Sequence, residues 1–333
     1  MANHCNVYIP TEANLDLCAQ LLREGNVVSV PTETVYGLAG NPLIEESARK
    51  IFTVKGRPFI DPLIVHFPNV ETVAKHIEIN ATVELLAAKF WPGPLTMVVK
   101  KRDSIPDIVT AGLPSVAVRV PRHPIFRSLL ERLDFPLAAP SANPFGYVSP
   151  TLASHVASTL GERIPAVLDG GPCELGIEST IIDLRDPANP AIFRHGPITQ
   201  EALTQALGMN IADHTAGVLN NKAKAAPGLL TKHYSPRAQV YLFKCGTVPR
   251  RMREITHQQT QAVVFNEKPT FEPLSKHTFW LSEDGCAETV ARNLFELIQR
   301  LDQQGFDKLY VELSADHGIG KAINDRLHRA AAK

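Results

Sequence analysis

Four segments of this 333-residue chain carry polar or basic side chains beside short apolar runs. In open α/β sheets, ligands bind beyond the carboxyl ends of strands, so side chains from separate segments can meet around one molecule. The first segment, PTETVYGL at 31–38, directly follows VVSV and offers the hydroxyls of Thr32 and Thr34. An ordinary capping turn explains the same residues equally well, so this segment alone assigns no function.

Two further segments contribute positive charge. Lys55 and Arg57 flank Gly56, a spacing that suits a polyphosphate clamp or, equally, a solvated pair of cations. Arg119 lies inside the apolar run SVAVRV, where a buried guanidinium must be paired or must face a ligand carboxylate or phosphate. His66 lies between Val65 and Phe67, and a lone histidine among apolar neighbours is more often structural than functional.

The fourth segment, PLAAPSANPFGYVSP at 136–150, combines small residues with short hydrogen-bonding groups. Its alanines leave room for a flat ring such as adenine, and Ser141 and Ser149 lie close by in the sequence. GIEST at 176–180 adds Ser179 at the start of another apolar run. Together these segments predict one concave face lined with hydroxyls, small residues and cations.

Several common catalytic motifs are absent from the sequence. The chain has no G-x-x-x-x-G-K-[ST], no G-x-G-x-x-G and no G-x-S-x-G, so a nucleotide would be held in neither the P-loop nor the Rossmann manner. No catalytic residue can be assigned. We therefore expect chemistry by positioning and charge neutralisation rather than by a covalent nucleophile.

The elements that must position these residues alternate between short apolar runs and helical patterns over residues 1–208, which indicates an α/β domain. Some predicted strands follow one another without a helix, so we expect a mixed sheet. Residues 209–237 are predicted to form a linker, and residues 238–333 a second α/β unit. Its longest helix carries an apolar stripe at helical spacing that ends before Gly305.

The composition narrows the function classes. The 34 Lys and Arg residues balance 34 Asp and Glu residues, which argues against a nucleic-acid coat or a binder of anionic membranes. The longest apolar runs are too short to span a bilayer, and the N-terminus lacks a secretory pattern, so we expect a cytoplasmic protein. The five cysteines are scattered without zinc-type spacing, which predicts reduced thiols and no structural metal.

The sequence resembles the YrdC-like family of L-threonylcarbamoyladenylate synthases in its long, two-domain form. Motifs that match the family occur in order along almost the whole chain: PTETVYGL, K-G-R-P, PLIVH, FWPGPLT, VTAGLPSVAVRVP, LAAPSAN, GIEST, R-x-G at 194–196, KHYSP at 232–236 and GIGKAINDRLHRAA at 318–331. The resemblance implies a twisted, mixed α/β sheet with a basic concave face, followed by a smaller Rossmann-like domain.

The resemblance also implies a reaction. L-threonine, bicarbonate and ATP, with magnesium as the ion that accompanies ATP, would give threonylcarbamoyl-AMP, pyrophosphate and water. The product would be handed to other proteins that complete threonylcarbamoyladenosine in tRNA. The linker, with Tyr234, would close over the nucleotide as a lid.

Site residues follow from the positions that match the family's motifs. The residues expected to bind threonine are Thr34, His66, Arg119, Ala139 and Ser179. The residues expected to bind ATP are Lys55, Arg57, Asp61, Thr110, Ser141, Ser149, Arg194 and Tyr234. The chain departs from the family pattern at Ile60-Asp61, at Phe145 and at Ala39-Gly40; the first change places an anion beside the expected nucleotide.

Two alternatives belong to other function classes. The same concave face could bind RNA, and a salt-dependent RNA affinity without ATP turnover would favour that reading. A related carbamoyltransferase could use a similar first domain, although such enzymes normally carry other catalytic domains. The zero net charge and the pocket-type residues argue against the RNA-binding module.

Overall fold

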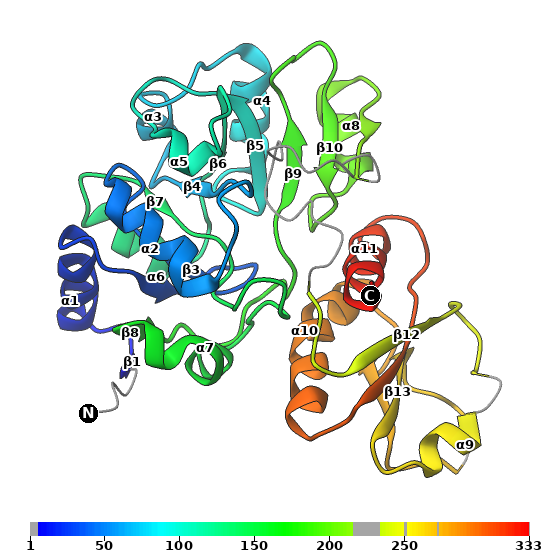
Figure 1. Ribbon diagram of the computed structural model, residues 1–333. Helices are drawn as coiled ribbons and strands as arrows, with labels where there is room; N and C mark the ends of the chain where they lie inside the picture. The colour runs from blue at the N-terminus through cyan, green and yellow to red at the C-terminus, as the bar shows by residue number, and fades with distance from the viewer. Residues whose placement is uncertain (1–5, 216–233, 250–251, 272, 333) are drawn as a thin grey trace.

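The computed structural model describes residues 6–215, 234–249, 252–271 and 273–332, and Figure 1 shows two α/β units joined side by side. The first unit contains a four-stranded sheet and a seven-stranded sheet. The strands of the smaller sheet are, in spatial order, β1 (Asn6–Tyr8), β8 (Ala166–Leu168), β2 (Val28–Val30) and β3 (Gly37–Ala39). Bridges from Gly37 to Ser141 and from Gly40 to Ala138 connect this sheet to the larger one.

The seven-stranded sheet mixes parallel and antiparallel pairs, which confirms the predicted mixed sheet. In spatial order its strands are β11 (Ala212–Asp213), β10 (Ala191–Arg194), β9 (Thr180–Asp183), β5 (Leu95–Lys100), β6 (Ser115–Arg119), β4 (Ile64–His66) and β7 (Leu137–Ala138). β4 and β6 are parallel with His66 opposite Arg119, whereas β5 and β6 are antiparallel. The register therefore places the two predicted threonine-site side chains on neighbouring strands.

Local sequence signals explain where several helices of the first unit begin and end. The helices are α1 (Glu12–Arg23), α2 (Glu45–Lys55), α3 (Val70–Val73), α4 (Ala81–Phe90), α5 (Asp107–Thr110), α6 (Pro124–Glu131), α7 (Ala153–Leu160) and α8 (Gln200–Leu207). α2 is followed by Gly56 and α8 by Gly208, both in the left-handed conformation that favours glycine as a C-cap. Pro124 opens α6, where its missing N–H costs no helical hydrogen bond.

The second unit is an all-parallel sheet covered by helices on both faces, as expected for a Rossmann-like domain. Its strands lie in the order β12 (Gln239–Phe243), β15 (Lys308–Glu312), β13 (Gln261–Glu267) and β14 (Thr278–Ser282). α9 (Met252–His257) packs on one face, and α10 (Ala287–Gln303) and α11 (Gly320–Ala331) pack on the other. The predicted stripe of α10 is buried: Val290, Leu294, Leu297, Ile298 and Leu301.

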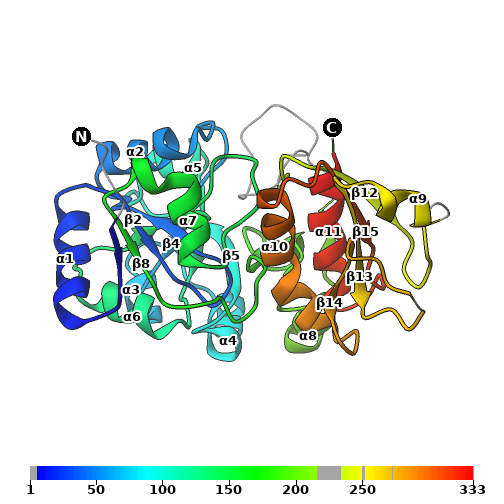
Figure 2. The same ribbon diagram turned by 90° about the horizontal axis from the view of Figure 1, so that it is seen from below.

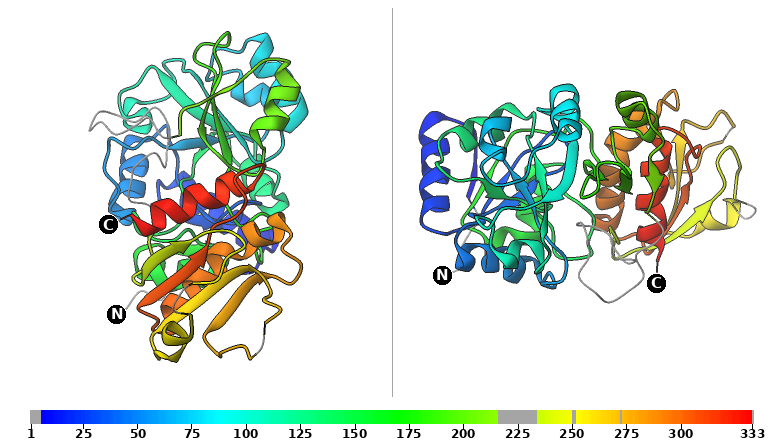
Figure 3. Two further views of the ribbon diagram at one scale, coloured as in Figure 1. Left: turned by 90° about the vertical axis from the view of Figure 1, so that its right-hand side faces the viewer. Right: turned by 90° about the horizontal axis from the view of Figure 1, so that it is seen from above.

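α10 and α11 form the layer between the two units, as Figures 2 and 3 show. Val35, Val148 and Ile177 of the first unit belong to the same apolar cluster as these two helices. Gln299 on α10 donates to the Ser149 carbonyl at 2.8 Å, and the Tyr147 hydroxyl donates to Asp302 at 2.7 Å. The two units therefore share a core and a set of buried hydrogen bonds.

The predicted boundaries of the units remain predictions. β11 pairs with β10 and carries the first sheet to Asp213, beyond the expected end at residue 208. Residues 216–233 of the expected linker, 209–237, lie outside the described residues. Among the helices that the structure does describe, none is long and apolar enough to cross a membrane.

Gly176 tests how closely α10 packs on the first unit. Its φ is +71°, and a Cβ there would lie 2.2 Å from the Arg292 carbonyl oxygen of α10. Gly208 has a similar φ of +66° with open space around it, so Gly208→Ala should cost only the left-handed strain of about 1–2 kcal/mol. We expect Gly176→Ala to lower the midpoint of thermal unfolding clearly further. Equal losses in the two variants would contradict the packing.

Candidate functional site

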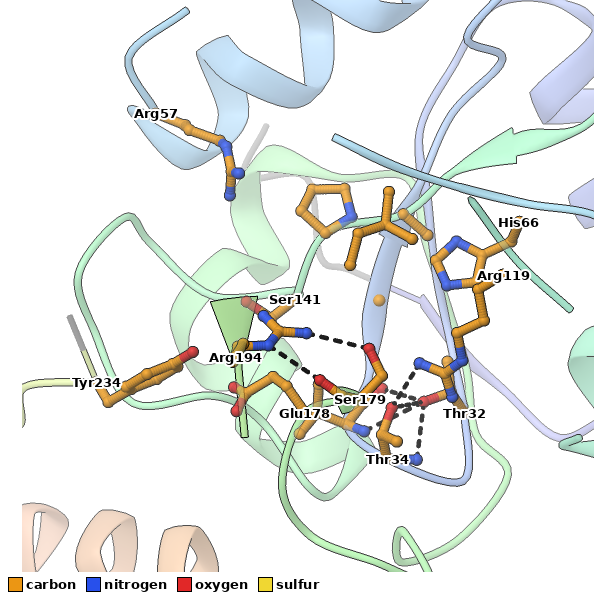
Figure 4. Close-up of a pocket in the computed structure, with 15 residues that line it drawn as sticks. Thr32, Thr34, Arg57, His66, Arg119, Ser141, Glu178, Ser179, Arg194 and Tyr234 are labelled. Carbon is orange, nitrogen blue, oxygen red and sulfur yellow. Dashed lines mark hydrogen bonds between the residues drawn. The ribbon is translucent and has the colours of Figure 1, made fainter. Parts of the chain in front are cut away.

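The predicted threonine residues and part of the predicted ATP set surround one narrow cavity of about 40 Å³ beyond the strand ends of the first unit (Figure 4). All five residues expected to bind threonine line it: Thr34, His66, Arg119, Ala139 and Ser179. Four of those expected to bind ATP do so as well: Arg57, Ser141, Arg194 and Tyr234. Pockets that enclose drug-sized ligands measure about 300–1,000 Å³, so this cavity is smaller than such a pocket.

Arg119 lies at the end of β6 and is buried. From the sequence we expect such a buried guanidinium to be paired or to face a ligand. Its Nε donates to the Gly93 carbonyl at 3.1 Å and its Nη1 to the Thr34 hydroxyl at 3.1 Å. Its Nη2 lies 2.8 Å from Glu33 Oε1. A guanidinium has five N–H donors, so these three contacts leave donor capacity for a ligand.

The turn after β2 fixes the hydroxyl of Thr34. Thr32 Oγ1 accepts from the backbone N–H groups of Thr34 and Val35 and lies 2.8 Å from Thr34 Oγ1. Neither threonine caps a helix, because strand β3 follows this turn. The turn therefore orients a hydroxyl toward the cavity, which favours the functional reading of PTETVYGL.

Arg194 and Ser179 form the opposite wall. Arg194 on β10 donates from Nε to the Ser179 carbonyl at 3.0 Å and from Nη2 to its hydroxyl at 3.1 Å. The same hydroxyl lies 2.7 Å from Thr96 Oγ1 on β5. Burial lowers the pKa of Arg194, yet an arginine remains charged at neutral pH. This wall therefore presents a fixed positive charge.

Lys55 takes a different position from the one expected for a phosphate clamp. Its ammonium donates to the carbonyls of Ser141 and Asn143 at 2.5 and 2.6 Å. Burial and the nearby Arg57 lower its pKa well below the usual lysine range. In this conformation Lys55 does not line the cavity; it holds the loop that carries Ser141.

Three other predicted ATP residues also lie outside the cavity lining. Asp61 is fully buried and pairs through Oδ2 with Arg57 Nη2 at 3.0 Å, so this departure from the family pattern supplies the anion for Arg57. The Thr110 hydroxyl donates to the Asp107 carbonyl at 3.4 Å. The Ser149 hydroxyl donates to Glu178 at 2.5 Å. Phe145, where the chain departs from the family pattern, is not among the lining residues.

His66 is held neutral. Burial lowers its pKa well below the usual histidine range, and the Arg119 guanidinium adds to the shift. Its ring packs 5.4 Å from that of Phe126, centroid to centroid. A neutral His66 therefore lines the cavity as an uncharged polar group.

Glu178 and Arg326 are site residues that sequence reasoning missed. Glu178 lines the cavity and accepts from Arg326 Nε at 3.0 Å. Arg326 comes from α11 of the second unit, is fully buried, and also donates to the His195 carbonyl at 2.7 Å. A signal did exist: Arg326 falls at the helical spacing of the buried residues Ile323 and Ala330.

Tyr234 joins the second unit to the cavity. It lines the cavity, its ring stacks 5.5 Å from that of Phe295 on α10, and the Arg326 guanidinium lies 5.5 Å from its centroid. Its φ of +62° is unusual for a bulky residue and is held by this packing. The aromatic anchor expected from the linker is therefore present at the site.

Comparisons with known proteins give this architecture a family. A family model described as "Telomere recombination" matches residues 20–196, and one described as "Threonylcarbamoyl-AMP synthase, C-terminal domain" matches residues 198–332. The threonylcarbamoyl-AMP synthases of Pyrococcus abyssi and Bacillus subtilis are 38% and 36% identical to this chain. They cover 96% and 94% of the chain over 94% and 91% of their own lengths.

The chain belongs to the threonylcarbamoyl-AMP synthase family. A crystal structure of Pyrococcus abyssi Sua5 complexed with L-threonine matches 98% of this chain and 97% of its own, with 35% identity and a TM-score of 0.88. The match extends through both units, so the arrangement of α10 and α11 against the cavity belongs to the shared fold.

The neutrality of His66 has a consequence for stability. An unfolded histidine titrates near pH 6.5, so below about pH 6.5 the unfolded chain binds a proton that folded His66 does not. As the pH falls through this range, we expect the free energy of unfolding of the natural chain to decrease by about 1 kcal/mol per pH unit more than that of His66→Gln. Urea unfolding of both proteins at pH 7.5 and 5.5 measures this, since the remaining histidines are common to both. Identical slopes would contradict the neutral assignment.

The Arg326–Glu178 pair connects the second unit to the cavity, so we expect its loss to change the KM for ATP. Arg326→Met would leave the Glu178 carboxylate uncompensated beside Arg194, a residue expected to bind ATP. We expect the KM for ATP to rise about ten-fold or more, and the added change Glu178→Gln to restore much of the loss. Arg300→Met, at an exposed pair within α10, is the matched control. An unchanged KM for ATP in Arg326→Met would contradict this coupling.

Proposed function

We propose that this protein converts L-threonine, bicarbonate and ATP into threonylcarbamoyl-AMP, pyrophosphate and water. The observation that carries the proposal is Arg119, a buried guanidinium held at Nε, Nη1 and Nη2, in a cavity with Thr34, His66 and Ser179. A fixed arginine fork suits a carboxylate. The relative that is complexed with L-threonine supports the choice of amino acid.

The first step joins nitrogen to carbon. With its carboxylate on Arg119, the amino acid would present its amine toward the remaining cavity space. The amine attacks the carbon of bicarbonate, a C–O bond breaks, and the departing hydroxide takes the amine proton and leaves as water, which gives a carbamate. Since His66 is neutral and Lys55 is engaged with backbone carbonyls, we assign no protein group as the base. The protein contributes positioning.

The second step joins oxygen to phosphorus. A carbamate oxygen attacks the α-phosphorus of ATP in line, and the bond to the β,γ-pyrophosphate breaks. Arg57 and Arg194 line the cavity on the side away from Arg119 and would offset the negative charge of the phosphates and of departing pyrophosphate (Figure 4). Enclosure by Tyr234 would keep water from the labile carbamate and adenylate.

Magnesium enters this proposal as part of the ATP substrate. Within the described residues no group of three or more His, Cys, Asp or Glu side chains could hold a metal ion. The one carboxylate in the cavity lining, Glu178, is engaged by Ser149 and Arg326. We therefore expect the phosphate oxygens of ATP to carry the ion. The adenylate product would pass to proteins that modify tRNA.

A pyrophosphate-release assay tests the proposal. The purified protein is incubated with ATP, magnesium and bicarbonate, with and without L-threonine, and the adenylate is identified by mass spectrometry. We expect pyrophosphate only with threonine. Arg119→Ala should lower kcat/KM for threonine about ten- to hundred-fold, whereas Arg122→Ala, at an exposed pair with Glu174, should not. Threonine-independent release, or salt-dependent RNA binding without turnover, would overturn the proposed function.

A further inference from the structure

Glu33 is a buried carboxylate directly behind the threonine side of the cavity. Its side chain is only 1% exposed, and it is not among the residues that line the cavity. Glu33 lies in the turn after β2, and the next residue, Thr34, lines the cavity. The proposed mechanism gives Glu33 no role, although burying a carboxylate costs free energy unless the charge is paired.

The contacts of Glu33 converge on Arg119. Oε1 lies 2.8 Å from Arg119 Nη2 and accepts from the Arg122 backbone N–H at 3.1 Å. Oε2 makes no hydrogen bond within the described residues. The Glu33 carbonyl accepts from the Leu175 N–H at 2.8 Å, which fixes the backbone of the turn. The carboxylate is thus held on a rigid turn beside a single side-chain cation.

Charge follows the same geometry. Burial by itself would raise the pKa of Glu33, but the Arg119 guanidinium outweighs that effect and holds the pKa below its usual range. The other ionisable groups coupled to Arg119 or Glu33 are His66, His123 and Cys173. Burial lowers the pKa of both histidines and raises that of Cys173, so all three remain neutral at pH 7. Arg119 and Glu33 are therefore the two charges of this cluster.

Carboxylate recognition by arginine depends on the plane of the guanidinium. Nε of Arg119 is fixed by the Gly93 carbonyl and Nη1 by the Thr34 hydroxyl, while Nη2 has only Glu33 beside it. Contacts at Nε and Nη1 alone would let the rigid, planar guanidinium tilt about the line that joins these two nitrogens, so a third contact at Nη2 is needed to fix its plane. Nη2 carries two N–H donors, so the 2.8 Å contact with Glu33 Oε1 fixes that end and still leaves one N–H for a ligand.

We propose that Glu33 is the positioning residue of Arg119: its carboxylate holds the guanidinium in the orientation that receives the substrate carboxylate and so sets the affinity for threonine. This inference rests on the proposed function, because it takes an α-amino acid carboxylate as the ligand of Arg119. Glu33 touches neither substrate directly. Its effect is therefore specific to threonine and absent for ATP.

The test compares Glu33→Gln with the natural chain. Glutamine keeps the size and removes the charge, so we expect the KM for threonine to rise about ten-fold or more, with the KM for ATP unchanged. Calorimetric titration with threonine alone should show the same loss of affinity. Glu174→Gln is the matched control, since Glu174 forms a 2.8 Å pair with the exposed Arg122. Thermal unfolding checks that each variant is folded.

A double-mutant cycle separates positioning from a structural role. If Glu33 acts through Arg119, Glu33→Gln should add no further loss of threonine affinity in an Arg119→Ala background. Should Glu33→Gln fail to fold, Glu33→Asp keeps the charge one methylene short, and an intermediate loss of threonine affinity is expected. Unchanged threonine affinity, an equal rise in both KM values, or the same loss without Arg119 would each overturn the proposal.

The outcomes also distinguish this inference from the proposed function. If the natural chain itself does not bind threonine, the function is wrong. If it binds threonine and Glu33→Gln binds it equally well, the function stands and only the role of Glu33 is wrong. Tighter binding by Glu33→Gln would mean that Glu33 competes with the substrate for Arg119 and would likewise overturn the positioning role.

Discussion

The buried ion pair between Arg326 and Glu178 is the interaction on which most of the site depends. Removing two charges from water costs several kcal/mol per ion, and good geometry with further hydrogen bonds is needed to offset it. Arg326 obtains these bonds from the His195 carbonyl and Glu178, and Glu178 from the Ser149 hydroxyl. Because the partners come from α11 and from the first unit, the cavity keeps its form only while both units are docked.

The same requirement explains the other cations around the cavity. Arg57 is matched by Asp61 and Arg119 by Glu33, while Arg194 is held by the backbone and hydroxyl of Ser179. Each guanidinium is thus held in place by neighbouring groups of the protein. The fold thus holds positive charge at defined points before an anionic substrate arrives, so little reorganisation is needed when it binds.

Features encoded locally were predictable from the sequence. The caps at Gly56 and Gly208, the mixed sheet and the buried stripe of α10 follow from turn chemistry and periodicity. The three-residue strand β3 was missed, because such a short run carries no usable period. The sequence also required a partner for Arg119, yet it could not name Glu33, since that pairing depends on how the turn after β2 meets the end of β6.

Side-chain direction and long-range partners account for the remaining differences. Lys55 and Arg57 are neighbours in the sequence, but only Arg57 lines the cavity, because the left-handed Gly56 ends the helix between them. Glu178 and Arg326 are 148 residues apart and come from different units. No local pattern reports such a contact, although an arginine on the buried face of a predicted helix signals that an anion must be found elsewhere.

The shared core has a consequence for dividing the chain. Val35, Val148 and Ile177 pack into the apolar cluster of α10 and α11. A fragment that ended near the end of the first sheet would expose these three side chains to water as one apolar patch and would tend to aggregate. Production of the first unit alone would therefore require polar substitutions on this surface in addition to truncation of the chain.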